Sequence, residues 1–249
     1  MMYTDAHIHL VHCGALPSFA ASAPYYACTC AHSPSEFRRQ QELIAALAAP
    51  HVHIVSAFGI HPQDPAADDG TFLESLLRGG DIRAIGEAGF DLFTPAFAAQ
   101  IDAQEKAWQV QVALAAAYGV PLVVHCRKGM ERLFRDSRQL KALRAVVFHS
   151  FAGSPQDARS LLRRGINAFF SVGKPVLNGK KSAIACVREL PADRLLLETD
   201  APFQTLKGEP RTDPADIARV YQTAAHLRGI PVDLLAAQVH ATFCAAFGC

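Results

Sequence analysis

Two histidines near the start of the chain, His7 and His9, are separated by one residue and follow the carboxylate of Asp5. Alternate residues of a β-strand point to the same face, so a strand here would place both imidazoles on one side and Ile8 on the other. Two neighbouring imidazoles near a carboxylate would supply about half of the ligands of a metal site. The remaining ligands must then come from elsewhere in the chain.

Further histidines and carboxylates follow short apolar runs. The segments are Gly59-Ile60-His61-Pro62, Gly86-Glu87-Ala88-Gly89-Phe90-Asp91, His125-Cys126-Arg127, His149-Ser150-Phe151 and Glu198-Thr199-Asp200-Ala201-Pro202. Each segment alone more often marks a turn, a helix cap or a structural hydrogen bond than a ligand. Together they favour one shared site, because a barrel that gathers the ends of its strands at one mouth accounts for all of them.

Four imidazoles and two carboxylates form the candidate ligand set: His7, His9, His125, His149, Glu87 and Asp200. This set suits borderline divalent ions better than Ca²⁺, and it exceeds the four ligands of a closed structural zinc site. Two ions about 3.5–4 Å apart, sharing a carboxylate and a water, would account for the ligands beyond four. We therefore expect one or two divalent ions per subunit, drawn from Zn, Mn, Co, Ni or Mg, with Glu87 as the bridge.

The apolar, β-branched runs that precede these residues predict eight strands. They lie at Tyr3–His7, Tyr25–Thr29, His53–Ala57, Ile82–Ile85, Leu122–His125, Val146–His149, Ala168–Ser171 and Leu195–Glu198. Strands that alternate with helices are typical of βα units with a parallel sheet. Because (β/α)8 barrels need about 250 residues, the 249 residues predict an α/β fold, a (β/α)8 TIM barrel forming a single domain over 1–249.

Segments of helical periodicity fill the gaps between the strands. They are Phe37–Ala48, Thr71–Leu77, Phe97–Tyr118, Met130–Leu143, Gln156–Arg164, Lys181–Leu190, Asp213–Arg228 and Val232–Phe247. We expect a break near the middle of Met130–Leu143. The segment Gly14–Ala23 is short and contains Pro17, so only one helical turn is expected there.

The other histidines and the cysteines provide a comparison. His51 and His53 precede a strand, so they should lie on the opposite rim and be structural or solvated. Four more histidines are expected to be surface or packing residues: His12, His32, His226 and His240. Cys28 and Cys30 fit small buried positions better than a metal site.

The composition limits the partners and the compartment. The net charge is +1, so any affinity for phosphates must come from a local basic cluster. Seven scattered cysteines and the lack of a secretory signal before Asp5 favour a reduced, cytoplasmic setting. We find no apolar run of about 18 residues, so no transmembrane helix is expected. Nothing in the sequence fixes the oligomeric state, and we take a monomer as the starting hypothesis.

The motifs DAHIHL, GIHP, IGEAGFD, VVHCR, FHSFAG and LLLETDAPF resemble, in this order, those of the TatD family of metal-dependent hydrolases in the amidohydrolase superfamily. The resemblance implies a (β/α)8 barrel and a DNase that removes nucleotides from 3′ ends. It also implies that His7, His9 and Asp200 hold one ion, that His125 and His149 hold another, and that Glu87 bridges them. Asp200 would accept the proton of the attacking water, and His61 and Arg127 would contact the substrate phosphate.

Basic and aromatic residues follow several of the predicted strands and suggest a DNA end or another phosphodiester as substrate. The basic ones are Arg127, Lys128, Arg132, Lys174, Lys180, Lys181, Lys207 and Arg211, and the aromatic ones are Phe90, Phe93, Phe151 and Phe203. The aromatic rings could stack a terminal base or pack in the rim. An amide or ester hydrolase would use nearly the same metal site and is the alternative. A barrel that binds metal without catalysis is the third hypothesis, although no ligand is missing.

Overall fold

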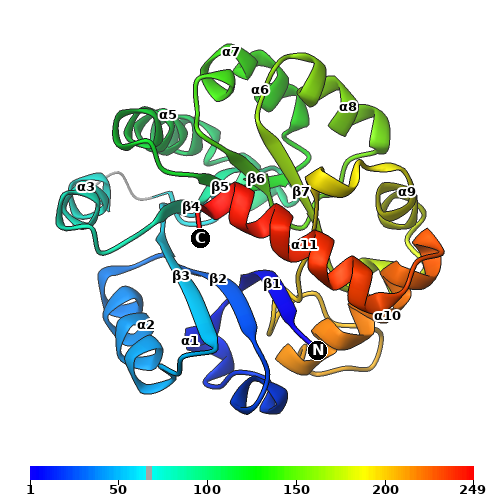
Figure 1. Ribbon diagram of the computed structural model, residues 1–249. Helices are drawn as coiled ribbons and strands as arrows, with labels where there is room; N and C mark the ends of the chain where they lie inside the picture. Colours follow the sequence, from blue (N-terminus) through cyan, green and yellow to red (C-terminus); the bar gives the residue numbers. More distant parts are fainter. Residues whose placement is uncertain (66–68) are drawn as a thin grey trace.

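The computed structural model describes residues 1–65 and 69–249. Across these residues, eight parallel strands stand in chain order around a barrel, and helices cover its outside (Figure 1). The strands are β1 (Tyr3–Ile8), β2 (Tyr25–Ala31), β3 (Val52–Phe58), β4 (Ala84–Asp91), β5 (Leu122–Arg127), β6 (Val146–Phe148), β7 (Ala168–Val172) and β8 (Leu195–Leu197). The predicted (β/α)8 fold is confirmed.

Backbone hydrogen bonds join the first strand to the segment that follows the last one. The N–H of Asp200 donates to the carbonyl of His7 at 3.0 Å, and the N–H of His9 donates to the carbonyl of Ala201 at 2.9 Å. These bonds close the ring of strands at its C-terminal mouth. They also bring three predicted ligands, far apart in sequence, to one place.

Helices follow the strands in the expected order. They are α1 (Leu10–Cys13), α2 (Pro34–Ala46), α3 (Asp69–Gly79), α4 (Pro95–Ala98), α5 (Ile101–Tyr118), α6 (Met130–Arg135), α7 (Ser137–Lys141), α8 (Pro155–Arg163), α9 (Lys181–Glu189), α10 (Ile217–Arg228) and α11 (Val232–Phe247), with short 3₁₀ turns at Ser18–Ala21, Lys174–Val176, Ala192–Arg194 and Pro214–Asp216. Local sequence sets their limits. The Ser154 side chain caps α8 in a capping box with Asp157, and Gly119 ends α5 with φ of 63°.

Some predicted boundaries were wrong. The helix expected over Phe97–Tyr118 is two helices, because Thr94 caps a separate first turn that starts at Pro95. The break expected within Met130–Leu143 is confirmed between α6 and α7. Strand β2 runs to Ala31, two residues beyond its predicted end, and β4 runs to Asp91.

Two apolar layers hold the barrel together. The outer layer fills the space between the strands and the surrounding helices. The inner layer includes strand residues such as Val147, Phe169 and Leu196, and Phe243 and Phe247 of α11 pack against it. In Figure 1, α11 (red) crosses the barrel. It covers the mouth at which β3 begins, near Val52 and His53, and the cavity lies at the other mouth.

Among the described residues, no single helix is long and apolar enough to span a membrane. The bent pair Pro214–Arg228 and Val232–Phe247 meets the length and composition criteria only when both helices are taken together.

Candidate metal centre

The carboxylate of Glu87 lies at the centre of the open mouth and is buried. Three imidazole nitrogens surround each of its oxygens. Around Oε1 are Nε2 of His7 at 3.3 Å, of His9 at 3.3 Å and of His32 at 3.1 Å. Around Oε2 are Nε2 of His61 at 3.5 Å, Nδ1 of His125 at 3.2 Å and Nε2 of His149 at 2.6 Å.

Hydrogen bonds alone do not account for this arrangement. A carboxylate offers about four lone-pair positions, whereas six imidazole nitrogens lie within 3.5 Å of Glu87. A buried charge needs a paired charge or a metal ion. Nitrogen and oxygen donors in one buried cluster are the ligands of borderline divalent ions. The residues present therefore fit divalent metal binding, with Glu87 placed to share its two oxygens.

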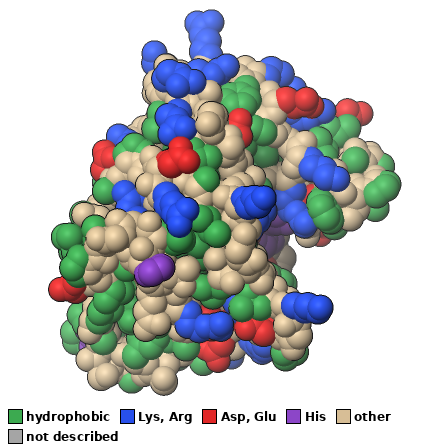
Figure 2. Space-filling model, turned by 90° about the vertical axis from the view of Figure 1, so that its right-hand side faces the viewer, with side chains coloured by type: hydrophobic (Ala, Val, Ile, Leu, Met, Phe, Trp, Pro, Cys, Tyr) green, Lys and Arg blue, Asp and Glu red, His purple; other side chains and the backbone are tan. Residues whose placement is uncertain are grey.

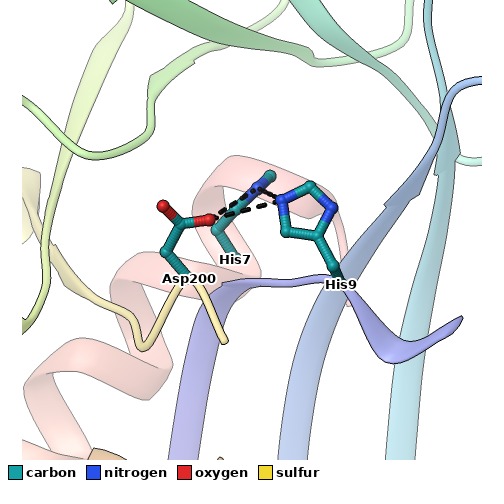
Figure 3. A group of neighbouring side chains, drawn as sticks. All are labelled: His7, His9 and Asp200. Carbon is teal, nitrogen blue, oxygen red and sulfur yellow. Dashed lines mark hydrogen bonds and ion pairs between the residues drawn. The ribbon is translucent and has the colours of Figure 1, made fainter. Parts of the chain in front are cut away.

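Asp200 completes the Oε1 side of the cluster. Its Oδ1 lies 3.3 Å from Nε2 of His9 and 3.7 Å from Nε2 of His7, and the three side chains converge in Figure 3. Burial raises the pKa of Asp200, but the hydrogen bond from His9 and the charges of His7 and His149 outweigh burial and hold the pKa below its usual range. Asp200 is therefore ionised at neutral pH.

Close contact between β4 and β5 positions Glu87. Gly89 pairs with His125 across these strands, and a Cβ on Gly89 would overlap the carbonyl oxygen of His125. Only glycine fits this approach. The pairing of β4 with β5 also shifts register between Ile85 and Ala88. Glu87 lies within this shift, and its side chain enters the cluster.

A second group of residues fixes the orientation of the ligands. Nε2 of His125 donates to Oδ2 of the buried Asp91 at 3.1 Å, which directs Nδ1 at Oε2 of Glu87, 3.2 Å away, where this nitrogen can bind a metal ion once it has lost its proton. Burial lowers the pKa of His125, but the hydrogen bonds with Asp91 and Glu87 outweigh it and raise the pKa to about 9. Asp5 accepts from the hydroxyl of Thr199 at 2.7 Å, which ties β1 to the segment after β8. No sequence pattern predicts these orienting roles, apart from the position of Asp91 near a strand end.

The two residues predicted to contact substrate lie beside the centre. Nε2 of His61 faces Glu87, and burial, followed by the charges of neighbouring histidines, lowers the pKa of His61 to about 4 against the opposing effect of Glu87. The Arg127 side chain is 42% exposed at the rim. Its guanidinium lies 4.0 Å over the ring of Phe93 and 3.8 Å from Asp91. The guanidinium can therefore contact an anion in the cavity while it keeps its contacts with Phe93 and Asp91.

A cavity of about 550 Å³ opens above the cluster, within the usual size of a small-molecule site. Phe93 and Phe203 are half-exposed near its rim, whereas Phe90 and Phe151 are buried and belong to the core. The idea that the ring could stack a base is therefore wrong for Phe90, whereas Phe151 lines the cavity although it is largely buried.

The predicted basic cluster is smaller than expected. Lys174 is fully buried, and its ammonium donates to Glu209 at 2.5 Å and to Asp216 at 2.6 Å. Arg132 is paired with Glu105. These two cations are engaged in the fold, whereas Arg127 and Lys180 line the cavity.

Of the histidines predicted to lie outside the site, some lie away from the cavity and others line it. His53 is exposed on the opposite rim and His51 bonds the carbonyl of Ala20, as predicted. The prediction for His32 was wrong, because this residue follows β2 directly and enters the cavity. His12 also lines the cavity but pairs with Glu36. Cys28 and Cys30 are buried, as predicted.

A (β/α)8 barrel that carries a buried cluster of histidines, Glu87 and Asp200 at the C-terminal mouth has the form of a metal-dependent hydrolase. A family model described as TatD related DNase matches residues 4–248, and this chain belongs to that family.

Individual relatives agree with this assignment. The chain is 34% identical over 214 residues to the 3′-5′ ssDNA/RNA exonuclease TatD of Erwinia amylovora, with 82% of each chain covered. The crystal structure of YjjV, a TatD homolog from Escherichia coli K12, matches with a TM-score of 0.83 and 25% identity over 99% of this chain and 98% of that one. An uncharacterized amidohydrolase from Saccharomyces cerevisiae shares the fold, with a TM-score of 0.76, 17% identity and coverage of 99% and 100%.

Proposed function

We propose that this protein is a divalent-metal-dependent exonuclease that removes nucleotides from the 3′ end of single-stranded DNA. The observation that carries the proposal is the Glu87 carboxylate between two groups of three imidazoles, beside the ionised Asp200. The similar TatD proteins named as 3′-5′ ssDNA/RNA exonucleases support the choice of substrate.

All six residues predicted from the sequence as metal ligands keep that role in the proposal. His7, His9 and Asp200 would hold one ion and His125 and His149 another, with Glu87 between them. Bound ions would lower the pKa of a water and neutralise the charge of a phosphate. Asp200 accepts the proton of the attacking water, because its carboxylate is ionised and lies within the cluster. The presence of two ions and the choice of metal are both part of this proposal.

Arg127 and His61 position the scissile phosphate. The guanidinium of Arg127 is held by Phe93 and can pair with two phosphate oxygens. His61 carries a proton on Nε2 in its neutral form, because the N–H of Gln63 donates to Nδ1. It can therefore donate to a phosphate oxygen at the centre.

The distribution of charge favours a short contact with a chain end. In Figure 2, which views one side of the barrel, Lys and Arg side chains are spread among other types and form no continuous basic strip. Long duplex binding needs many phosphate contacts, since affinity grows with each one. A cavity with Arg127 at its rim suits one or two terminal phosphates. Phe93 and Phe203, half-exposed, are available to stack a terminal base.

The decisive experiment compares substrates on one preparation. Mn²⁺- or Mg²⁺-loaded protein is incubated with 3′-labelled single-stranded DNA, with 5′-labelled DNA, and with a panel of amide and ester substrates. We expect early loss of the 3′ label and stepwise shortening of the 5′-labelled strand, both abolished in His125→Ala. Turnover of acyl substrates alone would contradict the proposal and favour an amidohydrolase. A metal-loaded protein inert on every substrate would support the hypothesis of a non-catalytic barrel.

Three expectations stay predictions: a single domain over 1–249, a monomer, and a cytoplasmic protein without membrane contact. Analytical ultracentrifugation and fractionation of cells would test the last two.

A further inference from the structure

His32 is the first residue after β2, and its side chain enters the cavity beside Glu87. Its Nε2 lies 3.1 Å from Oε1 of Glu87, and the side chain is 19% exposed. The backbone N–H of His32 donates to Oε2 of Glu36 at 2.8 Å, and Glu36 in turn is held by the capping Ser33 at the start of α2. The position of His32 is therefore fixed by the N-terminus of α2.

The hydrogen bond made by Nδ1, the other ring nitrogen of His32, shows which nitrogen carries the proton. Nδ1 lies 3.3 Å from the carbonyl oxygen of Gly59, which can only accept a hydrogen bond. Nδ1 is therefore the donor, and Nε2 of the neutral ring directs a lone pair at Glu87. Two acceptors 3.1 Å apart repel each other unless a proton or a metal ion lies between them. Metal-ligating histidines commonly donate their other N–H to a backbone carbonyl in this way.

His61, on the other oxygen of Glu87, has the opposite arrangement. Its Nδ1 accepts from the N–H of Gln63 at 3.1 Å, so Nε2 carries the proton in the neutral ring. A nitrogen that carries a proton cannot ligate a metal ion. The two rings lie at similar distances from Glu87, but their hydrogen bonds give them different roles.

We propose that His32 is a seventh protein ligand, which binds through Nε2 the cation on the Oε1 side of Glu87. The proposal rests on the metal centre of the proposed function. The ligand atoms of His9, His32 and Glu87 lie within 4.8 Å of one another, as one bound ion requires. With His32, this side offers three imidazoles and two carboxylates. A nitrogen-rich set favours Zn²⁺ or Co²⁺ over Mg²⁺, which prefers oxygen ligands and water.

The test is a Co²⁺ titration of the metal-free protein, followed by visible absorption and by metal analysis after dialysis. It compares the wild type with His32→Ala, His32→Gln, His61→Ala and, as a remote control, His53→Ala. We expect both His32 variants to lose roughly tenfold or more in Co²⁺ affinity, at least as much as loss of an outer partner costs. Their absorption spectra should also change, since the coordination number changes. His61→Ala and His53→Ala should keep wild-type affinity and spectrum.

Two outcomes would overturn the proposal. Wild-type affinity and spectrum in both His32 variants would show that the ring makes only a hydrogen bond or a substrate contact. Equal losses of Co²⁺ affinity in His32→Ala and His61→Ala would contradict the assignment of His32 as a ligand and His61 as a non-ligand, which rests on where each ring carries its proton. Melting curves of the metal-free variants identify any that fail to fold. A wild type that binds Co²⁺ through His32 but releases no nucleotide would refute the proposed function and leave the ligand assignment intact.

Discussion

Nε2 of His149 lies 2.6 Å from Oε2 of Glu87, the shortest contact among the six predicted ligands. The two residues come from β4 and from the end of β6, strands that are not neighbours in the sheet. Burial raises the pKa of Glu87, but the charges of His149, His7 and His61 hold it well below the usual range. An ionised carboxylate at the meeting point of the strands is the feature on which the proposed metal binding and catalysis depend.

Asp200→Asn should abolish most activity while leaving the shape of the site unchanged. The amide cannot accept the proton of the attacking water, and loss of a general base costs about 10²–10⁴-fold in rate. We expect kcat for 3′-labelled single-stranded DNA to fall in this range. Because Asp200 is also a proposed ligand, the assay is run at saturating Mn²⁺ with the bound metal measured in parallel. A variant with normal metal content and normal kcat would exclude Asp200 as the base.

Divalent ions should stabilise the folded protein. A ligand that binds only the folded state, at 100 times its Kd, adds about 2.7 kcal/mol to the free energy of unfolding. For a chain of this size that corresponds to a rise in Tm of about 5–10 °C. Differential scanning calorimetry of chelator-treated protein, with and without Mn²⁺ or Zn²⁺, checks this. Glu87→Gln should lose most of the rise, and an equal rise in both proteins would place the stabilising ion elsewhere.

Arg127→Ala should weaken substrate binding more than it slows the chemical step. Hydrogen bonds to charged groups contribute about 1.5–3 kcal/mol, so KM should rise by about 10- to 100-fold. Arg127→Lys should recover only part of this loss, because an ammonium cannot pair with two oxygens at once. Arg159→Ala, which removes an exposed arginine paired with Glu189, is the control. Unchanged KM in Arg127→Ala would remove this residue from the phosphate site.

The buried Lys174 should make stability depend on acid pH. The hydrogen bond from Lys174 lowers the pKa of Glu209; burial raises the pKa of Asp216, but hydrogen bonds from Lys174 and Arg219 lower it overall. Carboxyls with a lowered folded-state pKa stabilise the fold above their unfolded pKa of about 4, and this contribution is lost as the pH falls through the folded value. Lys174→Met should flatten the fall in stability below about pH 5.

Urea unfolding at several pH values measures this dependence. The double variant Glu209→Gln/Asp216→Asn should be less stable than Lys174→Met at pH 7, because it leaves an ammonium buried without a counter-charge. The reverse order would contradict the buried pairing.

Strand ends made most of the site predictable from the sequence. His7, His125 and His149 follow apolar runs, and parallel strands bring such positions together whatever the spacing along the chain. His32 was missed for a local reason: β2 was expected to end at Thr29, so a residue that directly follows the strand was assigned to a loop. Helix and strand limits depend on tertiary hydrogen bonds that a local pattern does not contain.

Other features depend on partners distant in sequence. The basic residues after β7 and β8 looked like one cluster, but Lys174 is neutralised by Glu209 and Asp216, which no periodicity relates to it. The orienting bond from His125 to Asp91 likewise depends on the register of β4 and β5. Such contacts appear only once the strands are placed.

Anomalous diffraction from crystals grown with Mn²⁺ or Zn²⁺, recorded at the absorption edge of the metal, tests the central claim most directly. We predict two peaks, one beside each carboxylate oxygen of Glu87, with His9 and Asp200 contacting the first and His125 and His149 the second. Peaks away from Glu87, a single peak at saturating metal, or no peak in the cavity would contradict the account.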